Sequence, residues 1–540
     1  MARLSISSRL AKAMKYVQTR DAPEKGAAYF NEDLLPTPRG SSYNIGATLI
    51  SLGLRWWHCI LAAIIGSFIL SIIVVLNSRG ATRYHVGYPV YVRASSGIGG
   101  SRLFVTVRAS VAIIYFATQS YYGGMITSVC LRAIFGASWV NLPNRLPDSA
   151  GITSRDLLAF FIFWILQFGV MFLHPTVLRH LFVVKAVYTT AALLGVLGWA
   201  VHMNGGSLGD FTFDTQVTLH GSALVWPMVQ AINSVMGALC PILVNQPATW
   251  SQSLGILISK VLVMFVSCAT TSATTQFLGK SFWNVWDLYN EILSQYWGAQ
   301  ARAGMFFAGL GMVLAIIATN AGTNSLPVGA DLSGLLPRYI NIVRGQILCA
   351  VLAPLCVPWK IISSAQSFLT FLGSYTVFLM PTCGIMVVDY WIIRRGNFHV
   401  PSLYTKEPGT VYYYFHGWNL RAVAAWAGGV AFTVHGIAGS LGDGGAVGQG
   451  SKNMYKLGFL LSFGMGCLLY YVLTLIWPVR ILEGGESDED GGKGMGFEEM
   501  AECEGLLDGE SIEAIRAGIK QSVGKQTEKG VQIEVGVREV

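Results

Sequence analysis

Charged residues are scarce in this sequence. Asp, Glu, Lys and Arg make up 12% of its 540 residues, whereas soluble domains contain about 25%. The stretch 56–77 has none, and 53% of the chain is hydrophobic. An ordinary soluble domain is therefore excluded. Long uncharged apolar runs are typical of membrane-spanning helices, so the sequence predicts an all-α integral membrane protein in a lipid bilayer.

Several functional motifs are also missing. The nine cysteines show no metal-ligand spacing, and eight lie in apolar runs, where small packing residues are expected. There is no Ser-His-Asp arrangement or phosphate-binding loop, so we expect no enzyme, no metal and no cofactor. The net charge of +8 resides in loops and tails, as membrane topology requires, and does not indicate nucleic-acid binding. The basic N-terminus lacks the early apolar segment of a cleavable signal peptide.

Eleven apolar runs are long enough to cross a membrane. They lie at 56–77, 104–130, 154–174, 181–203, 221–244, 254–278, 303–326, 345–365, 367–393, 420–440 and 455–478. A shorter apolar element precedes them at 42–54. As a helix it would rise only about 20 Å, against about 30 Å of hydrocarbon.

The apolar runs divide the chain into three regions. We expect a cytoplasmic N-terminal tail (1–41), a transmembrane domain (42–480) and an acidic, Gly-rich, mostly disordered cytoplasmic tail (481–540). Trafficking partners of the tails would bind there.

The distribution of arginine and lysine predicts the topology. Four basic loops should be cytoplasmic, and with them the C-terminus: 78–103, 174–185, 332–344 and 394–421. Residues 283–297 space Trp and Leu at near-helical intervals, which is typical of an amphipathic helix at the outer interface or of an ordinary loop helix. Asp389 and Lys360 fall near span ends, where charged groups extend to the membrane surface. No charged residue is assigned to the middle of a span.

Polar residues inside spans are costly and indicate functional sites. In the run 104–130, Tyr115 and Gln119 are four residues apart and share a helix face. An aromatic ring beside an amide suits a flat heterocycle with amide-like edges. Hydrogen bonding between helices is the alternative.

Two further polar clusters lie in spans. Around 318–332, four polar residues are packed among Ala and Gly: Thr319, Asn320, Thr323 and Asn324. Their hydroxyls and amides could ligate a small cation or bind substrate, or the segment could simply allow close packing. In the segment 237–250, Pro241 follows Cys240 and would free backbone carbonyls inside a span. Transporters place substrate at such breaks, although a plain proline kink is the alternative.

Five segments along the chain carry further motifs: "NEDLLPTP" (31–38), "NSRGATRYHVGYPVYVRASSGI" (77–98), "RHLFVVKAV" (179–187), "TNAGTNSLPVGADLSGLLPRYINIVRG" (319–345) and "VVDYWIIRRG" (387–396). Together they resemble a fungal member of the nucleobase:cation symporter-1 family, in its uracil/allantoin/uridine permease branch. The resemblance implies twelve helices in a plasma-membrane transporter, the first ten forming a five-plus-five inverted repeat.

The resemblance also assigns roles to residues. Gln119 and Asn324 match substrate-binding positions, and Tyr115 matches a stacking position that is usually tryptophan. Cys240 and Pro241 lie at the break of helix six. Phe378 and Met380, in helix ten, are candidates for the gate.

In the family that the sequence resembles, the cation site lies at the positions that Ala318 and Thr319 occupy here. Thr319 matches a cation-site hydroxyl of sodium-coupled relatives, whereas Ala318 replaces the serine that precedes it there. One hydroxyl ligand fewer favours a co-transported proton over sodium.

We therefore expect a symporter that imports a small nucleobase-like heterocycle, such as uracil or allantoin, by alternating access. A thiamine or nucleoside-type vitamin permease is the alternative within transport, and a non-transporting nutrient receptor or truncated product is the alternative outside it. Relatives carry a longer segment between the equivalents of Pro38 and Ser42, and another after Pro247. Helix one is therefore expected to be truncated, and the chain as written to transport poorly.

Overall fold

The computed structural model describes the central part of the chain. The described residues are Leu49, 54–84, 86–173, 175–209, 221–238, 240, 243, 250–280, 282, 284–362, 364–396, 398, 401–404, 406, 408, 410–441 and 447–479. Both predicted tails and nearly all of the short element 42–54 lie outside them, as does Pro241.

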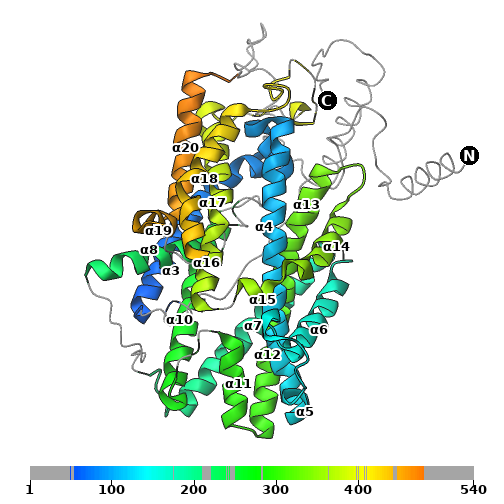
Figure 1. The fold of residues 1–540 in the computed structure, drawn as a ribbon, viewed down its shortest axis with the longest axis vertical. Helices are drawn as coiled ribbons and strands as arrows, with labels where there is room; N and C mark the ends of the chain where they lie inside the picture. The colour runs from blue at the N-terminus through cyan, green and yellow to red at the C-terminus, as the bar shows by residue number, and fades with distance from the viewer. Residues whose placement is uncertain are drawn as a thin grey trace, which may run out of the picture.

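Helices make up the regular structure of this part of the chain, and Figure 1 shows them packed lengthwise in an elongated bundle. The longer ones are α3 (Trp56–Tyr84), α4 (Tyr88–Phe135), α6 (Ser154–Val170), α7 (Pro175–Met203), α8 (Ser222–Gly237), α10 (Trp250–Leu278), α11 (Val285–Gln295), α12 (Ala299–Asn320), α13 (Leu326–Leu335), α14 (Ile342–Leu352), α16 (Ala365–Ser374), α17 (Thr376–Val388), α18 (Leu420–Leu441) and α20 (Gly458–Ile476). The short ones are α5 (Ala137–Val140), α15 (Pro358–Ile361) and α19 (Gln449–Lys456), with 3₁₀ turns at Asp148–Ala150, Ala353–Cys356 and Pro401–Leu403 and π-helical turns at Ala321–Ser325 and Asp389–Ile393.

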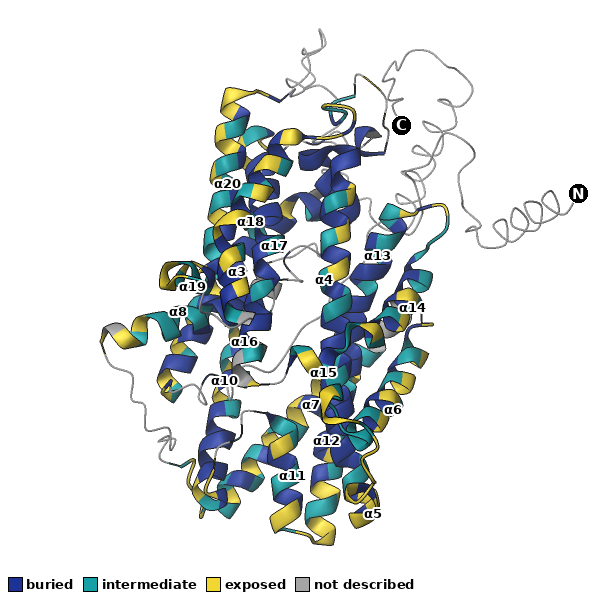
Figure 2. Ribbon diagram, in the orientation of Figure 1, coloured by how far each residue is buried: buried dark blue, intermediate teal, exposed yellow. Residues whose placement is uncertain are grey.

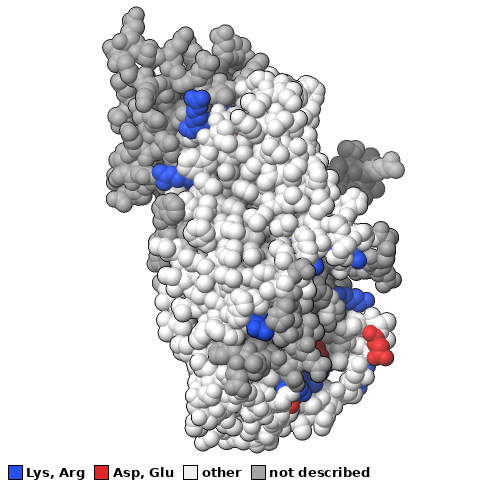
Figure 3. Space-filling view, turned by 90° about the vertical axis from the view of Figure 1, so that its left-hand side faces the viewer, with Lys and Arg blue, Asp and Glu red and all other residues white. Residues whose placement is uncertain are grey.

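Nine of the eleven predicted spans coincide with long apolar helices, whereas 345–365 is divided between α14, a 3₁₀ turn and α15. Of 221–244, α8 covers Ser222–Gly237, and part of the remainder lies outside the described residues. Among the described residues, nine helices are long and apolar enough to cross a membrane. Their outward faces carry large apolar side chains such as Phe68, Ile165 and Val187, which are 58%, 63% and 70% exposed, while the buried positions face inward (Figure 2). On the face in Figure 3 a broad band without charged side chains separates the charged residues near the two ends. The outer surface is therefore suited to lipid.

Helix α4 begins earlier than the sequence predicted. The basic stretch 78–103 was expected to be a loop, but α4 starts at Tyr88 and contains one break, at Gly97, whose φ is 79°. A Cβ there would lie 2.5 Å from the Gly417 carbonyl oxygen, so glycine is required. The loop prediction was wrong because Arg93, counted as a loop charge, is buried and donates to the Leu403 carbonyl.

A second basic loop is also helical. Residues 174–185 were expected to connect two spans, but α7 starts at Pro175, which suits a first helical position. Lys185 therefore lies within a membrane-spanning helix.

Two of the loops expected on the same side do meet. The end of α3 contacts the connection after α17, since the Tyr84 hydroxyl donates to the Gly396 carbonyl at 2.9 Å. The start of α4 reaches the same connection, because the backbone N–H of Asn419 donates to the Ser96 carbonyl at 2.9 Å. These segments gather at one end of the bundle, as their shared basic character predicted.

The predicted amphipathic segment 283–297 contains a helix, α11, at the opposite end of the bundle (Figure 1). Asn284 caps it by accepting from the Asp287 amide at 2.8 Å. Its apolar side chains Leu288, Tyr289 and Ile292 are buried in a cluster with α4, α7, α10 and α12. The helix therefore closes that end of the bundle.

Close packing of α13 on α14 depends on two glycines. A Cβ added to Gly345 would lie 2.6 Å from the Gly329 Cα, which is backbone and cannot rotate away. We expect Gly345→Ala to lower the free energy of unfolding by about 1–3 kcal/mol. The measurement is the thermal unfolding midpoint of the purified protein. Gly198→Ala on α7, where nothing lies within 4 Å, is the matched control; an equal effect of both variants would contradict this account.

Candidate functional site

The predicted stacking residue Tyr115 lies in an aromatic cluster between α4 and the α16–α17 segment. Its ring stacks on Phe371, with centroids 4.9 Å apart and planes 29° apart. It also meets the Tyr375 ring edge-on at 4.5 Å. The Tyr375 hydroxyl donates to the Gly237 carbonyl at the end of α8, close in sequence to buried Cys240. Residues from three parts of the chain thus gather around the Tyr115 ring, which is predicted to stack on substrate.

Gln119 lies one helical turn beyond Tyr115 on α4. Its side chain is partly exposed, and the part of the chain that the structure describes offers it no hydrogen bond. An amide with donor and acceptor both free is suited to bind a ligand with complementary edges.

Asn324 belongs to a buried amide network that joins three helices. Its Nδ2 donates to the Asn320 Oδ1 at 2.6 Å. Asn320 Nδ2 donates in turn to the Gln167 Oε1 of α6 and to the Phe116 carbonyl of α4, both at 3.0 Å. Gln167 Nε2 completes the network at 2.9 Å from Ser120 Oγ. Since Ser120 follows Gln119 directly, the network fixes this part of α4 against the segment that carries Asn324.

The segment that carries Asn324 is not a regular helix. Residues Ala321–Ser325 form one π-helical turn between α12 and α13, where the sequence predicted an unbroken span. Single π-turns inside α-helices occur often at functional sites, because they change the direction of side chains and backbone groups locally. All five of its residues are buried.

Gln167 is a functional candidate that the sequence reasoning missed. It lies in the apolar stretch 154–174, so its polarity within a span was a signal that could have identified it. Asn320 was recognised as part of a polar cluster, but its contact with Gln167, 153 positions earlier, could not be read from spacing.

Thr319 contacts a charged group from another helix. The Lys185 ammonium on α7 donates to the Thr319 hydroxyl at 2.6 Å. Ala318, beside it in sequence, is fully buried. The hydroxyl assigned to the cation site thus already interacts with a fixed positive charge.

A buried ion pair joins α4 to α13. Arg108 Nε donates to the Asp331 Oδ2 at 2.6 Å, and the guanidinium also contacts the other carboxylate oxygen and the Pro327 carbonyl. The Arg108 Cζ lies 4.0 Å from the centre of the Tyr88 ring. Both charged side chains are at most 3% exposed. The expectation of no charged residue in the middle of a span was therefore wrong, because these two charges neutralise each other inside the bundle.

The predicted gate residues lie elsewhere on α17. Phe378 packs against a cluster of Val377, Ile437 and Tyr455, and its carbonyl accepts from the Trp426 indole of α18. Met380 is fully buried in the main core. Their gating role stays a prediction. Phe371 and Tyr375 are the α16–α17 side chains that contact Tyr115.

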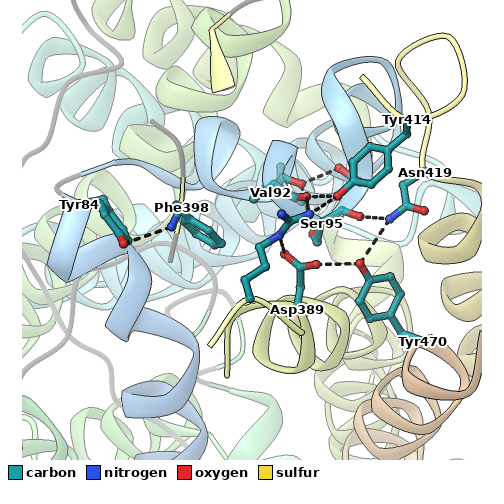
Figure 4. A network of polar contacts seen from close by, with 11 residues as sticks. Tyr84, Val92, Ser95, Asp389, Phe398, Tyr414, Asn419 and Tyr470 are labelled. Atoms are coloured by element: carbon teal, nitrogen blue, oxygen red, sulfur yellow. Dashed lines mark hydrogen bonds and ion pairs between the residues drawn. The ribbon is translucent and has the colours of Figure 1, made fainter. Parts of the chain in front are cut away.

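Asp389 does not extend to the membrane surface as its position near a span end suggested. It is 1% exposed and accepts from Arg394 Nε and the Tyr470 hydroxyl, both at 2.8 Å (Figure 4). Arg394 donates to the Tyr414 hydroxyl at 2.6 Å, and Tyr414 donates to the Ala94 carbonyl beside the break in α4. Burial raises the pKa of the Tyr414 phenol, which keeps it a neutral donor. This network holds the first turns of α4 against α20.

Comparisons with known proteins agree with these features. A family model described as a permease for cytosine/purines, uracil, thiamine and allantoin matches residues 41–462. The allantoin permease of Saccharomyces cerevisiae is 32% identical, with 81% of this chain and 71% of that protein covered. The uracil permease of the same yeast is 31% identical with the same coverage. These relatives are permeases, as the sequence predicted, and not enzymes.

A solved structure shares the fold. Mhp1, a nucleobase-cation-symport-1 family transporter, in a closed conformation with bromovinylhydantoin bound, superimposes with a TM-score of 0.61 at 20% identity. The match covers 84% of this chain and 98% of that one. The predicted helical transporter fold is thereby confirmed.

Removing one partner of the α4–α13 ion pair should be costly. Asp331→Asn leaves the Arg108 guanidinium buried without a counter-charge, and we expect it to lower stability by about 3–5 kcal/mol. The double variant Arg108→Met with Asp331→Leu should recover most of this loss, because neither charge remains. Folded protein recovered from membranes and its unfolding midpoint provide the measurement. An undiminished yield for Asp331→Asn would contradict the ion-pair role.

Proposed function

The chain belongs to the family of permeases for cytosine/purines, uracil, thiamine and allantoin, and from this premise we propose that it imports a nucleobase-like heterocycle, such as uracil or allantoin, across the plasma membrane. Transport would be proton-coupled symport by alternating access. The observation that carries the proposal is that the amide network holding Asn324 is bonded to α4 at Phe116 and Ser120, the residues that directly follow Tyr115 and Gln119.

The chemistry of this site suits such a ligand. The Tyr115 ring is packed against Phe371 and Tyr375, and a flat heterocycle could join this aromatic cluster by stacking, with its amide-like edges toward the Gln119 side chain. Asn324 retains a carbonyl oxygen to accept from the ligand, since its Nδ2 already donates to Asn320. Binding at the join of α4, α6 and the π-turn would let the ligand influence how these helices pack.

The contact between Lys185 and Thr319 supports a proton as the coupled ion. An ammonium donating to Thr319 places a positive charge where the sequence comparison expected a cation. Lysine gains and loses that charge as a proton, whereas a sodium ion would compete with the ammonium for the same hydroxyl. Ala318 offers no replacement ligand through its side chain.

One observation favours a second candidate, a vitamin permease for thiamine or a nicotinamide nucleoside. Tyr115 occupies the position where the resemblance expects tryptophan, and Tyr375 packs edge-on against it. The ring of Tyr115 is smaller than that of tryptophan and has the Tyr375 ring beside it, so the pair would accept a ligand of a different shape. A substrate panel in uptake assays separates the two candidates, and a receptor that does not transport would show binding without uptake.

We expect Gln119→Ala to weaken substrate binding about tenfold or more, since an unpaired polar edge of the bound ligand costs about 1–3 kcal/mol. Radiolabelled uptake is measured in permease-deleted yeast with uracil, allantoin, uric acid, uridine and thiamine. The assay uses the chain as written beside a version with the segments after Pro38 and Pro247 restored, which we expect to be more active. Gln300→Ala, an exposed amide of α12, is the control. Unchanged uptake kinetics in Gln119→Ala at equal surface level would refute the assignment.

Proton coupling predicts that uptake rises as external pH falls and is unaffected when sodium is replaced by choline. Lys185→Met should remove the dependence on pH, because the group that carries the proton is gone, while Lys360→Met should preserve it. The measurement is the initial rate of uptake between acidic and neutral pH in both buffers. A strict requirement for sodium would overturn the proposal.

A further inference from the structure

A groove between α7 and α12 lies apart from the candidate substrate site. It has a volume of about 750 Å³ and follows α7 from Tyr188 to Met203 and α12 from its N-cap, Gly298, to Ala308. Tyr296, which follows α11, lines the groove at the end of the bundle that this helix closes (Figure 1). The proposed transport mechanism assigns no role to this groove.

The groove exists because the two helices separate toward one end. At Gly311 of α12 they touch, since a Cβ added there would lie 2.9 Å from the Ala192 Cβ of α7. The Thr189 hydroxyl donates to the Gly311 carbonyl at 3.1 Å in the same contact. Two helical turns away, at Gly304 of α12, an added Cβ would meet nothing within 4 Å, and the same holds at Gly195 of α7. The side chains present therefore leave the space between the helices open.

The groove opens on the lipid-facing side of the bundle. Both α7 and α12 belong to helices that are long and apolar enough to cross a membrane. Val187 and Leu194 of α7 are 70% and 53% exposed, and Phe307, which lines the groove on α12, is 57% exposed. In a bilayer such side chains contact hydrocarbon. The groove is thus continuous with the surface that lipid covers, and an occupant would enter it from the membrane.

The chemistry of the lining favours a neutral occupant with one polar end. None of the described residues that line the groove is charged, so a phospholipid phosphate would find no counter-charge there. Trp199 and Tyr296 line it toward the α11 end, with ring centroids 6.1 Å apart. Trp and Tyr are typical of the level of the lipid headgroups. Their indole N–H and phenol hydroxyl can form hydrogen bonds with a single ligand hydroxyl.

The length of the groove suits a rigid molecule that spans one leaflet. From Gly298 to Ala308 the groove follows α12 for about 15 Å, which is half of the hydrocarbon thickness of about 30 Å. A rigid molecule loses less conformational freedom in a preformed groove than a flexible acyl chain does. Sterols are flat, rigid and apolar, and they carry one hydroxyl at one end.

We propose that a membrane sterol binds in this groove, with its ring system between Gly195 and Gly304 and its hydroxyl at Trp199 and Tyr296. A membrane-spanning helix of a second copy fits less well. It would extend along the whole membrane, whereas the groove ends where α7 and α12 touch at Gly311.

The test is photolabelling of the purified full chain in phosphatidylcholine nanodiscs. The probe is a cholesterol analogue that carries a diazirine on its ring system. We expect saturable labelling of peptides from α7 and α12, and excess unlabelled ergosterol should prevent it. Labelling that is spread over all lipid-facing helices, or that excess sterol does not reduce, would overturn the proposal.

Variants that fill the groove assign the labelling to it. Gly195→Leu and Gly304→Leu should each lower the labelling about fivefold or more, because the new side chain occupies the space that the sterol rings need. Both replace a helical glycine at an open position, so we expect both variants to fold. Gly198→Leu is the matched control, since its position on α7 is equally open but does not line the groove, and it should label like the original chain. Unchanged labelling in both filled variants would refute the site.

Two other occupants give distinct results. A photoreactive phosphatidylcholine that labels the same peptides as strongly, and is blocked by the same variants, would assign the groove to an acyl chain and overturn the sterol proposal. A cross-linked dimer that Gly304→Leu disrupts, without sterol labelling of the original chain, would assign the groove to a second copy. None of these readouts uses uptake, so the proposal stands or fails separately from the proposed transport.

Discussion

The structure depends on one constraint, which is that polar groups inside an apolar bundle must find their partners within it. Lipid tails are as apolar as leucine, so apolar contact alone does not select one arrangement of membrane helices over another. The ion pair of Arg108 with Asp331 does select one, because it fixes α4 against α13 at a single register. The amide network of Asn320 and Gln167 does the same for α4, α6 and α12.

Helix α4 takes part in most of these contacts. Its first turns are tied to α20 through Asp389, Arg394 and Tyr414, and its middle is tied to α13 through Arg108. Beyond these two attachments it presents Tyr115 and Gln119 to the candidate substrate site. A helix held at its end and middle can keep these side chains in place while neighbouring helices move.

The same constraint explains why lysines matter in this molecule. The buried arginines Arg108 and Arg394 are paired with carboxylates, and buried Arg93 donates to the Leu403 carbonyl oxygen. Lys185, in contrast, donates to a neutral hydroxyl, that of Thr319. A lysine gains and loses its charge with a proton, which is why the Lys185–Thr319 contact supports the proposed proton coupling.

The sequence by itself determined the helical membrane class, the positions of nine of the eleven predicted spans and the placement of Tyr115, Gln119 and Thr319 on helices. These properties follow from local composition and from the period of the α-helix, which act over a few residues. Family motifs added the transporter fold. The stretch 78–103 was misread as a loop, because counting arginines does not tell whether a distant carbonyl oxygen such as that of Leu403 will accept from them.

Only the tertiary structure decided which of the polar residues meet. Lys185 contacts Thr319, 134 positions away, and Arg108 contacts Asp331, 223 positions away. The π-turn at Ala321–Ser325 likewise lies where α12 and α13 pack on α4, and a run of Ala, Gly, Thr and Asn did not predict it. Such contacts depend on how whole helices pack, and side chains far apart in the chain carry no local signal of the partner they will find.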